Sequence, residues 1–253
     1  MPIRKNRVAP VYFSISGPIL VWYNKAMKQL FAYFKSIDTG WKGIWLFIFC
    51  GFITLDILAP GFFGVTLLKL LGVGICTLYV IVNFKKDQLL LIAFLLTFLA
   101  DILLAINNVS TFGIFAFIIA QFFHFSRLRS SGNKFIAASL CGISAYFILA
   151  ILAGQYSIYL LGAIYAFFLI ANLLLSFRWH ENARKSDQAL CAFFGFALFF
   201  CCDFCVAGSF FSSIHVLPFA LKRLFDFFAW FFYFPSQVLL SNSSKKLSKH
   251  AKL

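Results

Sequence analysis

The chain has 253 residues, of which 62% are apolar, 12% are charged and 37 are phenylalanine. An ordinary soluble domain is apolar over about half of its residues, so this composition excludes that class and indicates a protein whose solvent is lipid. Lys and Arg number 22 against eight Asp and Glu, an imbalance that a soluble nucleic-acid binder also shows. The positions of the charges decide between these two classes.

Eight stretches carry almost no charge, and each is about long enough to cross a hydrocarbon core of roughly 30 Å as a helix. We expect these helices at about residues 43–60, 61–83, 88–107, 110–127, 135–153, 156–177, 188–208 and 224–241. The predicted fold class is therefore all-α, a polytopic transmembrane bundle of about eight spans that covers residues 43–241. We read residues 1–42 as a basic arm with an interfacial helix at 11–36 rather than a ninth span, and residues 242–253 as a basic disordered tail.

Lys and Arg gather on one side of these spans. Nineteen of the 22 lie in the arm, in the loops near residues 85, 130 and 184, or in the tail. The opposite loops carry only Lys222 and Arg223, and Lys69 falls inside a span. Because cytoplasmic loops retain positive charge during insertion, we expect both termini in the cytoplasm and a bacterial inner (plasma) membrane. A nucleic-acid binder has no reason to place its Lys and Arg on one side of apolar spans, so no nucleic-acid partner is predicted.

Two aspartates lie deep inside predicted spans, where an ionisable group costs roughly 2.5 to 3.5 kcal/mol on insertion scales. Asp101 lies about 13 residues into the third span and Asp203 about 15 residues into the seventh, which runs in the same direction. At ~1.5 Å per residue both lie roughly 20 Å from the cytoplasmic boundary. Two carboxyl groups close together in a low dielectric do not both ionise readily. One protonated and one charged carboxyl group would make a general acid beside an anion.

Other polar residues of the spans have structural as well as functional explanations. Lys69, Asp56 and Asp226 fall near the level of the two aspartates. Lys69 would form either a structural ion pair or part of a site, and the two carboxylates would be either hydrated at the interface or part of that site.

Interhelical hydrogen bonds would explain a further set of polar side chains in the spans. They are Gln121 and His124 on the fourth span, Asn172 on the sixth, and Tyr233 and Gln237 on the eighth. We expect His124, near the cytoplasmic end, at the interface.

No metal or cofactor is predicted. All seven Cys fall within predicted spans, which disfavours a disulfide framework. The other three His lie in loops or the tail, so a three-His zinc site inside the bundle cannot be assembled.

Four short motifs resemble the lysoplasmalogenase-like family, also called the YhhN family. They are "LLTFLADILLA" with Thr97 and Asp101, "FGIFAFIIAQFFHF" with Gly113, Phe117 and Ala120, "GFALFFCCDFCVA" with Gly195, Phe199 and Asp203, and "YFPSQVLLS" with Tyr233, Gln237 and Ser241. Lys69 in "LLKLLG" is similar to the family's Lys-Pro-Leu. Ala100, Gln121 and Leu70 depart from the usual Gly, His and Pro, and Gln121 puts a proton relay at its position in doubt.

This resemblance implies an eight-helix bundle that hydrolyses the vinyl ether bond of lysoplasmalogens to a fatty aldehyde and a glycerophospho-base. It implies that Asp101 and Asp203 are the catalytic pair, without saying which is the acid. We expect Lys69, Thr97, Gln121, His124, Tyr233 and Gln237 to bind substrate or support the pair. The implied partners are a lysophospholipid substrate and membrane lipid.

Two other classes remain open from the residues alone. A proton-coupled carrier of a small molecule or lipid also places carboxylates at mid-depth. A membrane scaffold without enzymatic activity would use the aspartates only for stability.

Overall fold

The computed structural model describes residues 16–59, 63–84, 87–106, 111–154, 157–183, 186–214 and 216–244. The chain divides into two compact units, Met1–Ile37 and Asp38–Leu253. The first unit contains helix α1 (Ser16–Ser36). The loop cations near residues 85 and 184 and the tail from residue 245 lie outside the described residues.

The described part of the second unit is helical throughout. Its elements are α2 (Thr39–Leu58), α3 (Phe63–Asn83), α4 (Gln88–Ile106), α5 (Thr111–Arg129), α6 (Asn133–Leu152), α7 (Ser157–Asn182), α8 (Asp187–Ser213), the 3-10 turn η2 (Phe219–Leu221) and α9 (Lys222–Ser241). Among the described helices, these eight α-helices are long and apolar enough to cross a membrane, and α1 is not among them. The prediction of an all-α, multi-pass integral membrane protein with eight spans is confirmed.

The helix ends depart from the predicted spans where local bonding continues beyond the apolar run. α2 begins at Thr39, four residues before the predicted start, because the Asp38 side chain caps it by accepting a 2.8 Å hydrogen bond from the Gly40 N–H. α7 continues to Asn182 and α8 to Ser213. Helix ends are set by caps and backbone hydrogen bonds, whereas a hydropathy pattern marks only the part that suits hydrocarbon.

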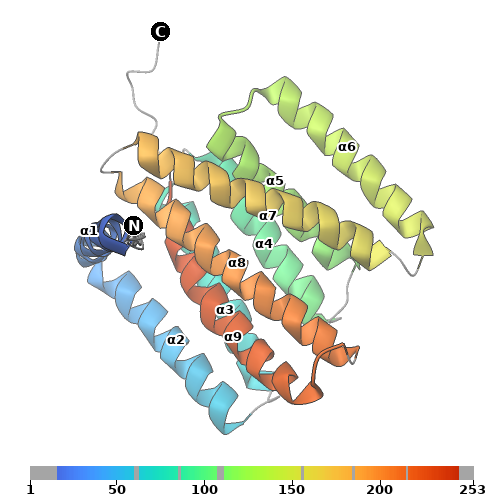
Figure 1. The fold of residues 1–253 in the computed structure, drawn as a ribbon, viewed down its shortest axis with the longest axis horizontal. Helices are drawn as coiled ribbons and strands as arrows, with labels where there is room; N and C mark the ends of the chain where they lie inside the picture. The colour runs from blue at the N-terminus through green and yellow to red at the C-terminus, as the bar shows by residue number, and fades with distance from the viewer. Residues whose placement is uncertain are drawn as a thin grey trace, which may run out of the picture. The chain divides into compact units, whose positions relative to one another are not determined.

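Six helices form a closed ring in which each packs against the next, in the order α3, α4, α5, α7, α8, α9 and back to α3. The other two spans lie outside this ring (Figure 1). α2 packs on α3 and α9, and α6 packs on α7 and α5. The interior of the ring is therefore the place where side chains from most spans meet.

The packing order is the same in the two halves of the bundle. α2 to α5 and α6 to α9 each comprise one outer helix followed by three consecutive ring helices. Because each half has an even number of spans, the two halves run parallel rather than inverted. α4 and α8 are the corresponding middle helices of the two triplets, and they carry Asp101 and Asp203.

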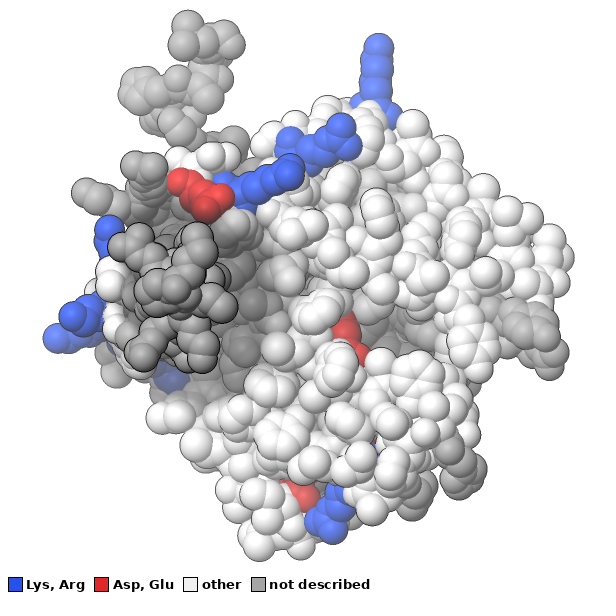
Figure 2. Space-filling view, viewed as in Figure 1, with Lys and Arg blue, Asp and Glu red and all other residues white. Residues whose placement is uncertain are grey.

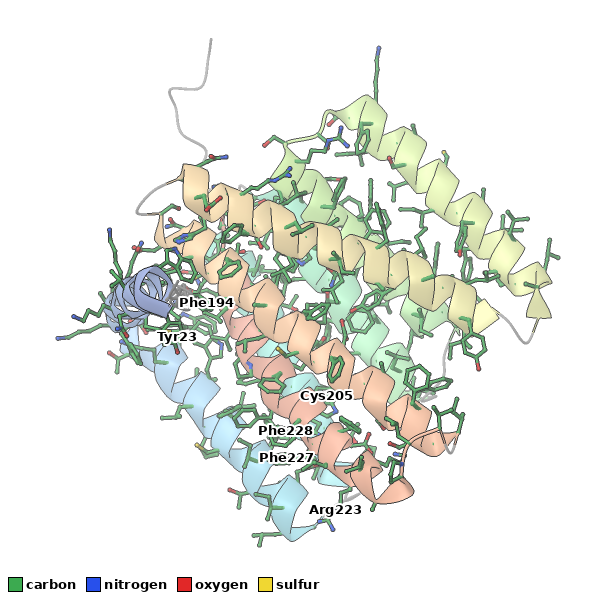
Figure 3. The ribbon with its side chains drawn as sticks, in the orientation of Figure 1. Tyr23, Phe194, Cys205, Arg223, Phe227 and Phe228 are labelled. Atoms are coloured by element: carbon green, nitrogen blue, oxygen red, sulfur yellow. The ribbon has the colours of Figure 1, made fainter. Side chains whose placement is uncertain are left out.

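The bundle has one strongly basic end, which we call the basic end. Lys42, Arg129, Lys134 and Arg178 lie there, at the start of α2, the end of α5, the start of α6 and the last turns of α7. The opposite end, the Lys222 end, carries Lys222 and Arg223 at the start of α9, and Figure 3 labels Arg223 there. Over α7, α8 and α9, Figure 2 shows an uncharged face between these ends, with an acidic side chain near its centre.

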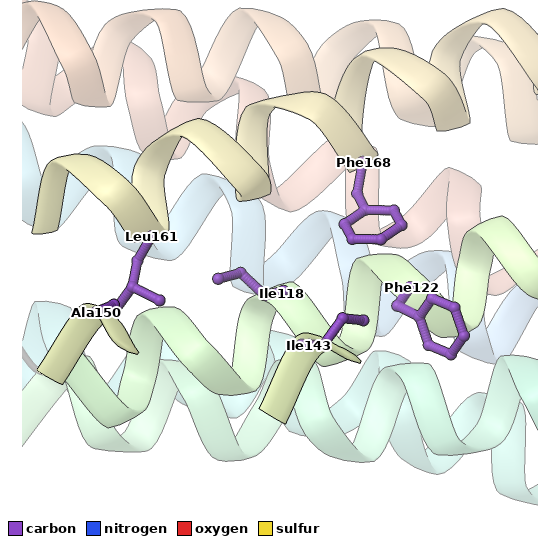
Figure 4. Packing of buried hydrophobic residues seen from close by; sticks show 6 residues of the cluster. All are labelled: Ile118, Phe122, Ile143, Ala150, Leu161 and Phe168. Atoms are coloured by element: carbon purple, nitrogen blue, oxygen red, sulfur yellow. The ribbon is translucent and has the colours of Figure 1, made fainter. Parts of the chain in front are cut away.

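The outer helix α6 is held by an apolar cluster shared with α5 and α7 (Figure 4). Its members are Ile118, Phe122, Ile143, Ala150, Leu161 and Phe168. On the other side of the ring, α8 and α9 approach closely at Gly195, where a Cβ would lie only 2.8 Å from the Leu240 Cγ. Gly195, a residue of the predicted motif, therefore allows α8 and α9 to pack closely.

Candidate functional site

Each of the two mid-depth aspartates accepts a hydrogen bond from a tyrosine of another ring helix. The Tyr233 hydroxyl on α9 donates to Asp101 Oδ2 on α4 at 2.7 Å, and the Tyr165 hydroxyl on α7 donates to Asp203 Oδ2 on α8 at 2.7 Å. Tyr233 and Tyr165 thus each orient one carboxyl group inside the ring, and the two Asp–Tyr pairs are the first polar group of the bundle.

A chain of aromatic rings joins these two Asp–Tyr pairs. The ring centroids of Tyr165 and Phe117 are 6.2 Å apart, those of Phe117 and Phe199 are 6.4 Å apart, and those of Phe199 and Tyr233 are 5.5 Å apart. All three contacts are edge-to-face, a preferred arrangement for aromatic pairs. Phe117 and Phe199 thus form an apolar layer between the two tyrosines, and both are residues of the predicted motifs.

The two aspartates differ in their exposure. Asp101 is 7% exposed, whereas Asp203 is partly exposed. Asp203 lies sixteen residues after the start of α8 at Asp187 and ten before its end at Ser213. Asp203 is therefore the less buried of the two aspartates.

Thr97 and Gln237 lie within one turn of the Asp101–Tyr233 pair. Thr97 is buried on α4 four residues before Asp101, and Gln237 is buried on α9 four residues after Tyr233. Residues four apart share a helix face, so both belong to the faces that carry the pair. Gln237 Nε2 contacts Ser236 Oγ at 3.5 Å.

Gln121 is bonded to a neighbouring helix, as predicted for the polar residues of the spans. Asn172 Nδ2 on α7 donates to Gln121 Oε1 at 2.8 Å and to the Gln121 carbonyl at 2.9 Å. The expectation that His124 lies at the interface is wrong. His124 is 2% exposed, because its ring packs edge-on against Phe94 and Phe196, at 6.2 and 5.3 Å between centroids.

Lys69 belongs to a second polar group, which we call the Lys69 cluster. It consists of Lys69 with Asp56 and Trp230, and of Asp226 with Ser209 and Lys222. The two sets meet on α9, where Asp226 and Trp230 are four residues apart and share a helix face. Lys69 Nζ donates to Asp56 Oδ1 at 3.3 Å and lies 4.7 Å from the centroid of the Trp230 ring. Lys69 is thus ion-paired with Asp56, as in the structural alternative, and Asp226 bonds to Lys222 and Ser209 rather than to Asp101 or Asp203.

A third polar group ties the chain together near the basic end. Arg127 Nη1 lies 3.5 Å from Asp87 Oδ2 and donates to the Ser243 carbonyl at 3.1 Å, and Ser244 Oγ contacts Asp87 Oδ2 at 3.3 Å. Asn242 accepts a 2.9 Å hydrogen bond from the Tyr79 hydroxyl. Residues 242–244, which we assigned to the tail, are buried here.

Reasoning from sequence did not single out Tyr165, Trp230 or the Asp87–Arg127 pair. Tyr165 lies seven residues before Asn172, two turns along the same helix face. That spacing was the available signal, because Asn172 already marked the face of α7 that looks into the ring. Trp230 had a similar signal, three residues before Tyr233 on α9.

The comparisons with known proteins agree with the motifs. A family model described as the YhhN family matches residues 64–244, which takes in α4, α5, α7, α8 and α9 with both aspartates and both tyrosines. No curated protein and no solved structure matches the chain. The match extends over most of the chain, and the chain therefore belongs to the YhhN family of integral membrane proteins.

Proposed function

We propose that this protein is a membrane-embedded hydrolase that cleaves the vinyl ether bond of lysoplasmalogen-type lysophospholipids, releasing a fatty aldehyde and a glycerophospho-base. The observation that carries the proposal is the pairing of Asp101 with Tyr233 and of Asp203 with Tyr165 inside the membrane spans. An ionisable group at that depth requires a partner or a task. A tyrosine hydroxyl orients a carboxyl group without neutralising its charge, so the pairing favours a catalytic role over a structural ion pair. Membership of the YhhN family adds support.

Hydrolysis of a vinyl ether needs a general acid and a general base that both reach the same substrate molecule. Proton transfer to the vinyl carbon remote from oxygen uses the π electrons to form a C–H bond and leaves an oxocarbenium ion. Water adds to the cationic carbon and loses a proton, and the hemiacetal then collapses to the aldehyde and the free alcohol. In the proposal one aspartic acid donates the first proton, and the other aspartate stabilises the cation and accepts the proton from water.

The tyrosines fix which oxygen of each aspartate does this work. Tyr233 and Tyr165 both donate to Oδ2, so proton transfer is assigned to Oδ1 of Asp101 and Asp203. The aromatic layer of Phe117 and Phe199 would attract the oxocarbenium ion, because the face of an aromatic ring is electron-rich. The same layer excludes bulk water, which strengthens the electrostatic effect of the carboxylate.

The direct test is aldehyde release from a lysoplasmalogen by the purified protein in detergent. General acid or base catalysis contributes roughly 10² to 10⁴-fold, so Asp101→Asn and Asp203→Asn should each lower kcat by about that factor. Asp187→Asn, on the same helix as Asp203 but sixteen residues away, is the matched control and should keep wild-type turnover. An aspartate whose Asn variant keeps full activity has no place in the mechanism.

A second measurement tests the chemistry itself. In D₂O, protonation at carbon should place one deuterium on the carbon next to the aldehyde group, and mass spectrometry of the trapped aldehyde should show it. An aldehyde without that deuterium would mean that the C–O bond breaks by another route.

A further inference from the structure

The Lys69 cluster contains two ion pairs, and one is more buried than the other. Lys69 and Asp56 link α3 to α2, with side chains 11% and 21% exposed. Lys222 and Asp226 are one turn apart on α9 with a 2.7 Å contact, and their side chains are 36% and 48% exposed. Ser209 on α8 also donates to Asp226. The cluster thus runs from the Lys222 end of the bundle towards its interior and carries no net charge.

Trp230 joins this cluster to the aspartate pair. The Lys69 ammonium lies over the Trp230 ring, and that ring meets the Tyr233 ring edge-on with 5.2 Å between centroids. Tyr233 in turn donates to Asp101. Trp230 precedes Tyr233 by three residues on α9, a rise of ~4.5 Å along the helix. A group bound beside Trp230 is therefore about one helical turn from a group bound at Asp101.

The aspartates lie closer to the Lys222 end than to the basic end. Asp101 is five residues from the end of α4 at Ile106 and thirteen from its start at Gln88, which gives ~8 Å and ~20 Å. For Asp203 on α8 the corresponding rises are ~15 Å and ~24 Å. In Figure 3, Arg223 lies at the Lys222 end, Phe227 and Phe228 lie next to it, and Cys205, two residues after Asp203 on α8, lies further in.

We propose that the Lys69 cluster is a binding site for the headgroup of the lipid substrate, and that it takes a zwitterion made of a phosphate and an ammonium. Lys69 would bind the phosphate as a point charge. Asp226 would bind the headgroup ammonium, and the Trp230 ring would bind it further by a cation–π contact. A zwitterion exchanges partners with the two resident ion pairs and leaves the cluster neutral, whereas a phosphate alone leaves it with excess negative charge.

This headgroup site rests on the proposed function, and it adds the orientation of the substrate within the bundle. In a lysophospholipid the ether bond lies next to the glycerol, just below the phosphate. A headgroup held at the Lys69 cluster, with its glycerol extending past Trp230, brings that bond to the level of Tyr233 and Asp101. The substrate would then occupy the bundle with its headgroup at the Lys222 end, opposite the basic end.

The test is a binding measurement with ligands that carry a saturated ether and so are not cleaved. The probes are a 1-alkyl-glycero-3-phosphocholine, the corresponding 1-alkyl-glycerol 3-phosphate and the 1-alkyl-glycerol, each titrated into the purified protein in detergent. We expect the phosphocholine ligand to bind at least ~10-fold more tightly than the other two, because it alone engages both charged pairs. Equal affinity for all three ligands would overturn the proposal.

A double variant and a control variant separate a loss of binding from a loss of folding. Lys69→Gln alone leaves Asp56 without its cation, so the double variant Lys69→Gln with Asp56→Asn is measured beside it, and both should lose the preference for phosphocholine. Lys134→Gln, at the basic end, should keep that preference. If the double variant folds and still prefers phosphocholine, the headgroup site is wrong. If binding follows the expectation but no aldehyde is released from the vinyl ether, the proposed function fails and the site stands.

Discussion

Tyr233 donates a 2.7 Å hydrogen bond to Asp101 from a helix 132 residues further along the chain, and its ring also meets Trp230. Tyr233 therefore contacts two of the polar groups of the bundle, through Asp101 and through Trp230 of the Lys69 cluster. The corresponding donor to Asp203 is Tyr165, so that each carboxyl group is oriented by a neighbour that carries no charge.

Removing either hydroxyl should slow catalysis without removing the catalytic groups. A hydrogen bond to a charged group contributes ~1.5 to 3 kcal/mol, so Tyr233→Phe and Tyr165→Phe should each lower kcat by roughly 10 to 100-fold. Tyr146→Phe is the matched control, because its hydroxyl donates to the Leu160 carbonyl, away from both aspartates. Aldehyde release measures the effect, and full activity in both variants would contradict the assignment of orienting roles.

The Arg127–Asp87 pair should matter for stability rather than turnover. Removing one partner of a buried ion pair costs ~3 to 5 kcal/mol, because the other charge stays buried without compensation. Arg127→Met should therefore lower the Tm in detergent strongly. Arg129→Met should lower it much less, because Arg129 is exposed and lies over the Phe125 and Phe135 rings. The double variant Arg127→Met with Asp87→Leu should recover part of the loss, and a Tm no higher than in Arg127→Met would count against the ion pair as the cause.

The Asn172–Gln121 contact provides a test of packing between α7 and α5. Interhelical hydrogen bonds in membranes contribute ~0.6 kcal/mol on average and at most ~1.7 kcal/mol. A double-mutant cycle of Asn172→Leu and Gln121→Leu should give a coupling free energy in that range, measured from unfolding in mixed detergent micelles. A coupling of zero would mean that the side-chain bond makes no net contribution in the folded bundle.

The architecture and the depth of the aspartates follow from patterns that a sequence displays directly. Apolar runs of fixed length give the spans, and counting residues along α4 and α8 places Asp101 and Asp203 at one level. The partners of these residues are another matter, because they depend on which helices become neighbours. Among the 37 Phe and nine Tyr of the chain, the spacing from Asn172 marks the helix face of Tyr165 but does not name its partner. Its role appears only when α7 packs beside α8.

The same limit explains His124 and Arg127. We expected His124 at the interface and counted Arg127 among the cations of the loop near residue 130, because both lie near the end of a span, where side chains ordinarily reach water. The ring order of the helices puts α5 between α4 and α7, so His124 and Arg127 face neighbouring helices instead, whereas Arg129 is exposed. Position along a helix gives depth, whereas the direction of a side chain around the helix depends on the tertiary packing.

The aromatic layer between the two Asp–Tyr pairs gives the last prediction. Phe199 is 2% exposed and contacts both Phe117 and Tyr233, whereas its neighbour Phe200 is 40% exposed and faces away from the ring interior. If Phe199 stabilises a developing cation, a contact worth ~0.5 to 2 kcal/mol, Phe199→Leu should lower kcat by roughly 2 to 30-fold. Phe200→Leu should leave kcat unchanged.

Phe199→Tyr separates this electronic effect from simple packing, because it retains the aromatic face that Leu removes. We expect Phe199→Tyr to keep most of the activity that Phe199→Leu loses, provided that both variants unfold at similar temperatures. Equal losses of kcat in the Leu and Tyr variants would show that the shape of the buried side chain is what matters. The layer would then serve only to close the site to water, and the stabilisation of the cation would fall to the aspartate alone.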